Sequence, residues 1–502
     1  MTIQLSIQNE LDQASQAPLQ QLCEDHFASR LLSRDETLWG KAARDEASKR
    51  LGWVDPFTTA EQVLEEATQL RDELRARGID RIMLCGMGGS SLGPEVIARE
   101  AGVQLTVLDS THPDVVRRAL TGALTRTAVV VSSKSGGTIE TRSHAETFLA
   151  AFRSAGLDPK AHVFYVTDPG SPLSGEAEQG YRVFLADPNV GGRFSALTAF
   201  GIVPTVLAGA DMGRVLSEAR AVHELLFADS PENPALRLAA AVAAALPERY
   251  VLLLSEGSEG VEQSWGLSDW IEQLVAESTG KEGVGVLPVA LPGGAHELLT
   301  PPPHAIAIRL NAPAKDQTSD IALVAPLGAQ LLLWEVATAA LGRLMRINPF
   351  DQPDVEAAKV AARSALQHAA ESLGDADAAH DDELIEQLQR AVSANGYVAI
   401  QAFVDRESPL GARAVRLRER LAAELGVPVA LGWGPRYLHS TGQLHKGGPA
   451  LGAFVQLVDD SATELPIGLE QAAGFGALMS AQARGDREVL EDRGRTVLRL
   501  AQ

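Results

Sequence analysis

Short apolar runs alternate with longer segments of helical period along the first half of the chain. The sequence places these runs at Arg81–Gly86, Leu105–Asp109, Thr127–Ser132 and His162–Thr167. Apolar runs of this length, separated by helical segments, are typical of parallel strands that are buried on both faces. We therefore expect an α/β layer in which helices cover both sides of a parallel sheet, the doubly wound arrangement.

A second series of apolar runs follows a helix-rich stretch at 193–246. It comprises Tyr250–Ser255, Gly285–Leu291 and Ala305–Leu310, and the pattern resumes at Tyr397–Val404, Val427–Gly432 and Ala453–Val458. The expected fold class is α/β, with two doubly wound parallel-sheet domains and helical extensions. The expected parts are a helical N-terminal extension at 1–45, a first domain at 46–232, a second domain at 233–370, and a segment at 371–502 that completes the second domain and closes with helices.

The composition is that of an ordinary folded protein. Apolar residues make up 45% of the 502 residues and charged residues 22%, so global disorder is not expected. The formal charge is -21 at pH 7, which argues against binding to nucleic acid or to an anionic membrane through bulk charge. An anionic substrate would therefore need a local cationic pocket.

Targeting and cysteine patterns indicate a cytoplasmic protein. The N-terminus lacks a basic region followed by a continuous apolar segment, so no secretory signal is predicted. The longest apolar stretch, Ala196–Ala210, contains Pro204 and is too short to cross a bilayer. Cys23 and Cys85 are the only cysteines, too few for a disulfide framework or a zinc site. We therefore expect a reducing environment and no membrane partner.

The first candidate site is GMGGSSLGP at Gly86–Pro94, between an apolar run and a predicted helix. Gly88 and Gly89 would let backbone N–H groups turn toward a ligand, with Ser90 beside them. The N-terminus of the following helix favours an anion or a sugar hydroxyl. The motif is neither a Walker loop nor a clean GxGxxG, and a tight strand-to-helix turn is the alternative.

The second candidate site is SSKSGGTIET at Ser132–Thr141, again between a strand and a helix. Ser133, Lys134, Ser135 and Thr138 would supply hydroxyl donors and one cation around two glycines. These groups suit a phosphate monoester, because donors are plentiful and the helix dipole favours a dianion. The alternative is that the hydroxyls are ordinary N-caps and the lysine is exposed.

A base and a cation are the third pair of candidates. Glu277 lies in the last turn of the helix predicted within SDWIEQLVAESTGKEG. The negative end of the helix dipole disfavours an ionised carboxylate there, which suits a general base near neutral pH if the side chain is buried. Arg193, in VGGRFSALTAFG, either reaches solvent or meets an anion. An exposed helical glutamate is the alternative for Glu277.

Two further segments carry polar candidates. In NPFDQPDVEAAK, Gln352 precedes the helix that Pro353 is expected to begin, and Lys359 lies on that helix. Near the C-terminus, LHSTGQLHKGG places His439 and His445 six positions apart among three glycines. By itself this stretch favours a flexible loop whose imidazoles make local hydrogen bonds. In the first segment, polar residues at a helix start such as Gln352 are more often helix caps than ligand contacts.

Together these motifs resemble those of glucose-6-phosphate isomerases, in the order that the family uses. The resemblance rests on GMGGSSLGP, SKSGGTIET, GGRFSALTAFG, AESTGK and FDQPDVEAAK, and HSTGQLHKGGP resembles the isomerase half of bacterial transaldolase–isomerase fusions. It implies two sugar-isomerase (SIS-type) domains that interconvert glucose 6-phosphate and fructose 6-phosphate through ring opening and a cis-enediolate. It implies no metal and no cofactor, a hexose 6-phosphate substrate, and the possibility of a homodimer.

The resemblance also implies roles for individual residues. Ser133, Lys134, Ser135 and Thr138 match the phosphate loop, and Ser90 and Gln352 match substrate contacts, with Gly88 and Gly89 beside the first of them. Glu277 matches the base that moves a proton between C2 and C1, and Arg193 the cation that steadies the enediolate. Lys359 and His439 match the residues of ring opening, and His445 is a neighbour that shapes the loop.

The chain departs from the family pattern in two places. The phosphate loop has Ser135-Gly136-Gly137 where the family has a bulkier, threonine-rich loop. The histidine segment, which the family places before its terminal lysine and brings in from the neighbouring subunit, here follows Lys359 by about eighty residues. Two other functions are left open: a phosphosugar-binding regulator without catalysis, and an isomerase that also accepts mannose 6-phosphate.

Overall fold

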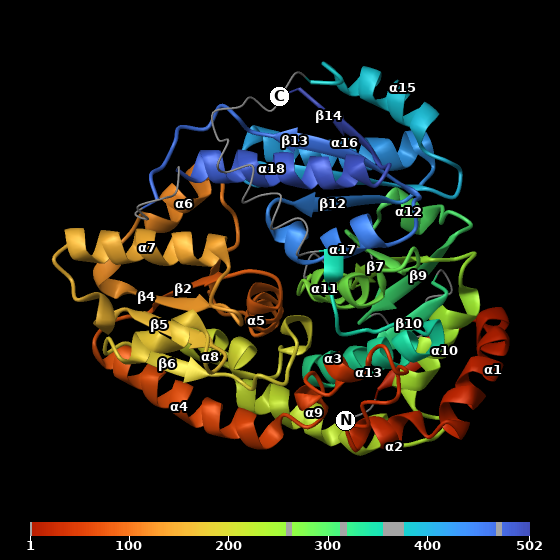
Figure 1. The fold of residues 1–502 in the computed structure, drawn as a ribbon, viewed down its shortest axis with the longest axis horizontal. Coiled ribbons are helices and arrows are strands. Elements are labelled where there is room, and N and C mark those ends of the chain that lie inside the picture. The colour runs from red at the N-terminus through yellow and green to blue at the C-terminus, as the bar shows by residue number, and fades with distance from the viewer. Residues whose placement is uncertain (1–2, 258–263, 312–318, 355–375, 468–473, 502) are drawn as a thin grey trace.

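The computed structural model describes residues 3–257, 264–311, 319–354, 376–467 and 474–501. Three separate β-sheets organise this part of the chain, and helices flank each of them (Figure 1). The first sheet lies in the N-terminal half, the second contains most of the middle strands, and the third is built from the C-terminal segment. No helix within these described ranges is long and apolar enough to span a lipid bilayer.

The first sheet is parallel throughout and is covered on both faces. Its order is β3 (Thr106–Leu108), β2 (Arg81–Gly86), β4 (Thr127–Ser132), β5 (Val163–Thr167) and β6 (Arg182–Leu185). One face packs against α4 (Phe57–Ala76), α5 (Gly89–Glu100) and α8 (Ala199–Ala208), and the other against α6 (Pro113–Leu120) and α7 (Ile139–Ser154). In β2, Leu84 points into the first core and Met83 into the second. The predicted doubly wound layer is confirmed.

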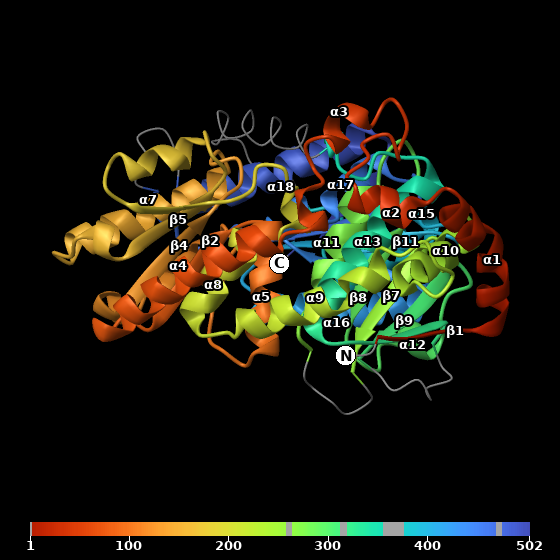
Figure 2. The same ribbon diagram turned by 90° about the horizontal axis from the view of Figure 1, so that it is seen from below.

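The second sheet is parallel except at one edge. Its order is β1 (Gln4–Ile7), β10 (Ile321–Val324), β9 (Ala305–Leu310), β7 (Val251–Glu256) and β8 (Leu287–Leu291), and β1 is antiparallel to β10. The helices that share its core are α1 (Asn9–Glu24), α9 (Met212–Leu226), α10 (Pro234–Ala245), α11 (Leu267–Thr279) and α13 (Leu327–Met345). Helix α1 lies at the end of the molecule opposite α7 (Figure 2).

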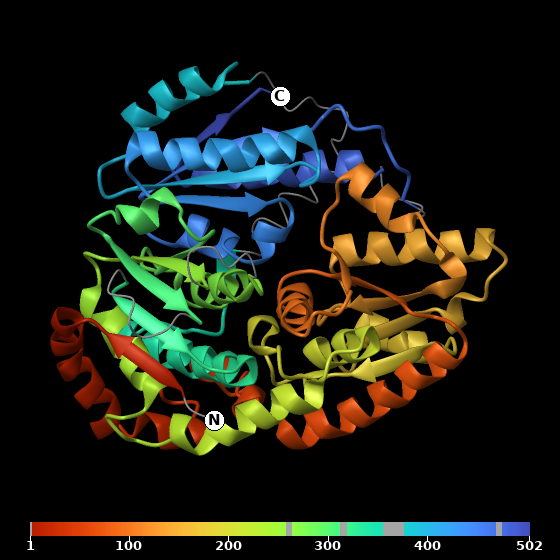
Figure 3. The ribbon, with the colours of Figure 1, turned by 180° about the vertical axis from the view of Figure 1, so that it is seen from behind.

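The third sheet is parallel and packs on the second. Its order is β12 (Val429–Trp433), β11 (Tyr397–Phe403), β13 (Gly452–Val458) and β14 (Thr496–Arg499). Ile400 points into a core with α15 (Asp381–Ala391) and α16 (Pro409–Leu425), whereas Ala399 shares a core with Leu253 of β7. From behind, this blue sheet lies above the other two (Figure 3). Helix α18 (Phe475–Asp492) reaches back to the first domain, where Phe475 stacks on His144.

Short helical pieces complete the described chain. They are α2 (Phe27–Leu32), α3 (Arg44–Ala47), α12 (His296–Leu299), α17 (Gly442–Gly447) and the 3-10 turns η1 (Gly52–Val54), η2 (Leu124–Arg126), η3 (Pro159–Ala161), η4 (Pro172–Ala177), η5 (Gly192–Phe194) and η6 (Arg436–His439).

The C-terminal segment and the N-terminal extension differ from their predicted forms. The strands of 371–502 do not extend the second sheet; among the described residues they pair with one another, and the last element is the strand β14. The extension at 1–45 begins with β1, whose Leu5 and Ile7 are only partly buried. A four-residue edge strand of this kind carries little periodic signal, and periodicity does not reveal which strands will pair.

Candidate active site

Two candidate loops meet at one edge of the first sheet. Strands β2 and β4 are parallel neighbours, so the glycine loop after Gly86 and the serine-rich loop after Ser132 leave from the same carboxyl edge. From there the chain enters α5 on one face of the sheet and α7 on the other. This change of direction makes a topological switch point, where open α/β sheets bind their ligands.

A buried carboxylate and a buried guanidinium form the centre of the site. Glu277, in the last turns of α11, is 6% exposed, and Arg193, in η5, is 3% exposed. The distance from Arg193 Nη1 to Glu277 Oε1 is 3.3 Å. Burial lowers the pKa of the Arg193 guanidinium, and the Glu277 carboxylate opposes that shift. The sequence-based alternative of an exposed helical glutamate is therefore wrong.

Arg193 is held in place by α11 and by the segment that follows α13. Its Nε donates to Ser278 Oγ at 2.7 Å, Nη2 to Pro349 O at 2.6 Å and Nη1 to Gln352 Oε1 at 3.1 Å. These bonds leave the guanidinium little freedom to turn. They also bring Gln352, predicted as a substrate contact, next to the charged pair.

Lys281 holds the segment that precedes Gln352. The lysine is buried, and its Nζ donates to Asn348 O at 2.7 Å and to Asp351 O at 2.7 Å while pairing with Asp351 Oδ1 at 2.6 Å. Burial, with the nearby Arg193, lowers the pKa of Lys281 to about 8. In the sequence this lysine only marks the end of a helix, and its position two residues after α11 gives no signal of its burial.

Gln273 is a site residue that the sequence reasoning missed. Its Nε2 donates to Glu277 Oε2 at 3.1 Å and to the backbone oxygen of His439 at 2.8 Å. The available signal was its spacing, since residues four apart share a face of a helix. Gln273 thus links the predicted base to the segment that carries the predicted ring-opening histidine.

His439 lies within this site and in the same chain. Its Nε2 is 3.0 Å from Oε1 of Glu140, a buried carboxylate in the first turn of α7, and Gln482 Nε2 donates to the same oxygen at 2.7 Å. Burial by itself raises the pKa of Glu140, but the His439 imidazole outweighs it and the pKa lies below its usual value. With Glu140 ionised, Nε2 of His439 carries the proton of this bond. Glu140 was not singled out from the sequence.

The segment LHSTGQLHKGG is packed rather than flexible. It forms the end of η6 and the helix α17, whose six residues are all buried. Gln443 Nε2 donates to Gly280 O at 2.9 Å, and Lys446 pairs with the buried Asp486, which also accepts from Tyr437 OH at 2.7 Å. The glycines allow close packing here: a Cβ at Gly447 would lie 2.2 Å from Asp354 Oδ2.

His445 has surroundings of a different kind. Its Nδ1 is 3.1 Å from the hydroxyl of Tyr397, and the ring stacks on that tyrosine. Burial, with the nearby Lys446 and Arg495, lowers the pKa of His445 to about 3. The imidazole is therefore neutral at physiological pH and packs within the loop.

The two glycines of the first loop make close approaches to other parts of the site. Gly88 has φ +56°, and a Cβ there would lie 2.9 Å from His439 O. A Cβ at Gly89 would lie 1.8 Å from Gly192 O, next to Arg193. Side chains at these positions would displace the histidine turn or the arginine loop, and the following Ser90 lies in the first turn of α5.

The hydroxyl groups of the predicted phosphate loop form hydrogen bonds within the loop itself. Ser133 Oγ and Thr138 Oγ1 are 3.1 Å apart, and Ser135 Oγ accepts from the backbone N–H of Gly137 at 3.2 Å. The loop leads into α7, so the donors stand at a helix N-terminus. Lys134 pairs with Asp168 and donates to Pro188 O at 3.2 Å. Its side chain is thus directed toward these two acceptors.

The remaining predicted residue, Lys359, lies outside the described residues.

Within the described ranges, no three His, Cys, Asp or Glu side chains gather as a metal-binding group. Glu277, Arg193, Gln352, Gln273 and His439 are brought together by the contacts above, and the phosphate loop joins them through Glu140 on the helix that it precedes.

Comparisons with known proteins support the family resemblance. No protein-family model matches the chain. The chain is 34% identical over 253 residues to a glucose-6-phosphate isomerase of Thermus thermophilus. The aligned region covers 48% of this chain and 58% of that protein. It therefore spans little more than half the length of this curated relative. The chain is similar in sequence to glucose-6-phosphate isomerases, as the motifs predict, whereas the likeness to a transaldolase fusion stays a prediction.

Two solved structures have a related fold. A hypothetical protein from Thermus thermophilus matches with a TM-score of 0.61 and 27% identity, over 72% of this chain and 99% of that one. A glucose-6-phosphate isomerase from Chlamydia trachomatis matches with a TM-score of 0.56 and 18% identity, over 74% of this chain and 89% of that one. The predicted α/β fold class with parallel sheets is confirmed.

Proposed function

We propose that this chain catalyses the reversible isomerisation of glucose 6-phosphate and fructose 6-phosphate. The observation that carries the proposal is the buried pair of Glu277 and Arg193, held beside the loops at the switch point of the first sheet. Aldose–ketose isomerisation needs a base near a carbon-bound proton and a cation near the oxygen that becomes negative. The sequence similarity to glucose-6-phosphate isomerases supports the same activity.

In the proposed mechanism, Glu277 removes the proton from C2 of the open-chain aldose. The electron pair moves into a C1–C2 double bond, and the carbonyl oxygen at C1 becomes the enediolate oxygen. Arg193 stabilises this charge, which is worth more in a site that excludes water. Protonated Glu277 then returns the proton to C1, and the hydroxyl proton passes from O2 to O1, so that fructose 6-phosphate forms without net change in composition.

Other residues bind the substrate and open its ring. Ser133, Ser135 and Thr138 would donate to the phosphate together with the N-terminus of α7, and Lys134 would leave Asp168 to reach it. His439 would move a proton between the ring oxygen and the C1 hydroxyl through its Nδ1, since the bond from Nε2–H to Glu140 orients the ring and leaves Nδ1 for the substrate. Lys359 is proposed to assist this step. We place the activity in the cytoplasm, where the two free cysteines would stay reduced.

A coupled assay of glucose 6-phosphate formed from fructose 6-phosphate tests the proposal. We expect turnover by the unsubstituted chain and a loss of about 10²- to 10⁴-fold in Glu277→Gln, which keeps the shape but not the base. In D2O, the native chain should place deuterium at C1 of fructose 6-phosphate, and Glu277→Gln should not. Glu272→Gln, on the same helix, is the matched control and should retain turnover.

The outcomes separate the alternatives. Phosphosugar binding by calorimetry without turnover in the well-folded native chain would favour a regulator and overturn the proposal. Full activity in Glu277→Gln would leave isomerisation in place but reject the assigned base. Running mannose 6-phosphate in the same assay decides whether the substrate range includes the C2 epimer.

A further inference from the structure

Arg436 and His439 stand at the two ends of the same 3-10 turn, η6. Arg436 is buried, and its Nη1 donates to Glu95 Oε2 at 2.6 Å and to Asp109 Oδ2 at 2.8 Å. Glu95 lies on α5, and Asp109 directly follows β3, so both acceptors belong to the first domain. The guanidinium therefore ties the histidine turn to the helix that follows the first glycine loop.

The charges around Arg436 keep this contact ionised. Burial opposes the charge of the guanidinium, but Glu95, Asp109 and Asp269 of α11 outweigh it and raise the pKa of Arg436. Arg99 pairs with the other oxygen of Glu95 at 2.6 Å. Because removing one partner of a buried ion pair leaves an uncompensated charge, the turn cannot slip along α5 without a large cost.

The other end of the turn, at His439, is also held by hydrogen bonds. The backbone oxygen of His439 accepts from Gln273 Nε2 at 2.8 Å, and the imidazole Nε2 of His439 is 3.0 Å from Glu140 Oε1. We propose that Arg436 is a positioning residue for His439, which sets the imidazole against Glu140 and Gln273 by clamping the start of the turn to the first domain. This inference rests on the ring-opening role proposed above for His439.

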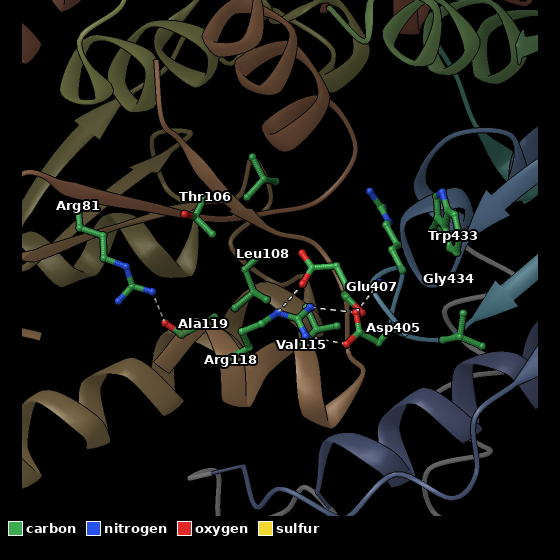
Figure 4. A pocket seen from close by; sticks show the side chains of 14 residues that line it. Arg81, Thr106, Leu108, Val115, Arg118, Ala119, Asp405, Glu407, Trp433 and Gly434 are labelled. Carbon is green, nitrogen blue, oxygen red and sulfur yellow. Dashed lines mark hydrogen bonds and ion pairs between the residues drawn. The ribbon is translucent and has the colours of Figure 1, made fainter. Parts of the chain in front are cut away.

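The competing explanation is that Arg436 only holds the first domain and the third sheet together. Another ion pair between the same two parts of the molecule serves as the control for that explanation. Arg118 of α6 donates to both oxygens of Asp405, which follows β11, at 2.6 and 2.9 Å (Figure 4). This pair lines a cavity of about 300 Å³ between the first domain and the third sheet. It joins the two parts without being on the histidine turn.

A double-mutant cycle distinguishes positioning from adhesion. Arg436→Lys keeps the charge, but the lysine side chain is shorter, so its ammonium cannot take the position at which Nη1 bonds both Glu95 and Asp109 unless the turn shifts. Misplacement of a catalytic group by about 1 Å costs on the order of 10²-fold in rate. We expect a loss of this order with cyclic glucose 6-phosphate. The loss should be smaller than about 3-fold with the 4,5-dideoxy analogue, which lacks the hydroxyls that close a five- or six-membered ring. In a His439→Ala background, Arg436→Lys should have no further effect.

The same cycle includes a control variant and defines the result that would contradict the inference. Arg118→Lys should change the rate by the same factor with both substrates, and its effect should be independent of His439→Ala. Independent effects of Arg436→Lys and His439→Ala, or equal losses with the two substrates, would overturn the inference. If Arg436→Lys does not fold, Asp109→Asn removes the charge of one acceptor of the same clamp, leaves Arg436 itself in place and enters the cycle instead.

A second measurement does not depend on turnover. The Nε2–H of His439 should give a protected imidazole proton resonance, identified by its loss in His439→Ala. We expect it to persist in Arg118→Lys and to broaden or exchange in Arg436→Lys. An unchanged resonance in Arg436→Lys would reject the clamp. If the native chain does not isomerise hexose 6-phosphates, the proposed function fails by itself, and this resonance still decides whether Arg436 positions the histidine.

Discussion

Two glutamates on helix α11 have opposite surroundings. Glu277 lies 3.3 Å from the Arg193 guanidinium at the end of the helix. Glu272 faces the carboxylate of Asp269 and a cavity of about 550 Å³ between the second domain and α16. Burial, with Asp269, raises the pKa of Glu272 to about 8. One helix therefore carries a glutamate that is paired with a cation and a second glutamate whose carboxyl group stays largely protonated at neutral pH.

The protonated Glu272 should make stability depend on pH. Because its pKa is about 8 in the folded chain against a usual 4.5, the folded state binds more protons than the unfolded state between these values. The free energy of unfolding should then fall as pH rises from about 5 to about 8. Glu272→Gln, which has no proton to lose, should show a shallower fall in urea unfolding at pH 5, 6.5 and 8. Glu419→Gln, an exposed position on the same cavity, is the control, and an equal change in both variants would contradict the assignment.

Close approach between short elements sets the geometry of the site. The N-terminus of α5 meets η5 where a Cβ at Gly89 would lie 1.8 Å from Gly192 O. Gly192 directly precedes Arg193, so the distance between these two backbones fixes where the guanidinium stands. The contact is between backbone atoms, and no side chain can move aside to relieve it.

Gly89→Ala should therefore affect both stability and catalysis. The added methyl group should destabilise the fold by about 1–3 kcal/mol, as overpacking does. By moving η5 and Arg193 it should also lower turnover by on the order of 10²-fold. Gly175→Ala, where nothing lies within 4 Å of the added atom, should leave both quantities nearly unchanged. Urea unfolding and the coupled assay measure the two effects, and a stable, fully active Gly89→Ala would show that the loop can yield.

Across the molecule, the site is assembled from three parts of one chain. The first domain supplies the switch-point loops, α11 of the second supplies Glu277, and the third sheet brings in His439 on the turn after β12. His439 contacts Gln273 of its own chain. We expect this chain to complete its site without a neighbouring subunit, in contrast to the arrangement that the family resemblance implies.

Subunit complementation tests this expectation. His439→Ala and Glu277→Gln, each with little activity, are co-expressed and purified together. If the histidine acts within its own chain, the mixture should be as inactive as the separate variants. If it crossed between subunits of a dimer, one site in each mixed dimer would hold both native residues, and about a quarter of the native activity would return. Such recovery would contradict the single-chain site.

Most of the strands and several of the site residues could be predicted from the amino-acid sequence. The runs at Arg81–Gly86, Thr127–Ser132 and Ala305–Leu310 match strands with the same bounds, because strands buried on both faces are continuous apolar segments. Short, half-exposed edge strands such as β1 and β6 were not predicted, since they share little of that signal. The ordered motifs indicated Arg193, Glu277, Gln352 and His439, which the structure brings together.

How these residues meet depends on tertiary contacts. Pairing between distant strands placed β11, β12, β13 and β14 in a sheet of their own, and no local pattern specifies that choice. Tertiary burial makes LHSTGQLHKGG the end of η6 and the packed helix α17 in place of the predicted loop, and it gives His439 and His445 different surroundings. Glu140 and Gln273, which contact His439, come from distant segments of the chain, and so do Glu95 and Asp109, which hold the start of its turn through Arg436. A contact between segments far apart in the chain leaves no trace in the sequence of either segment.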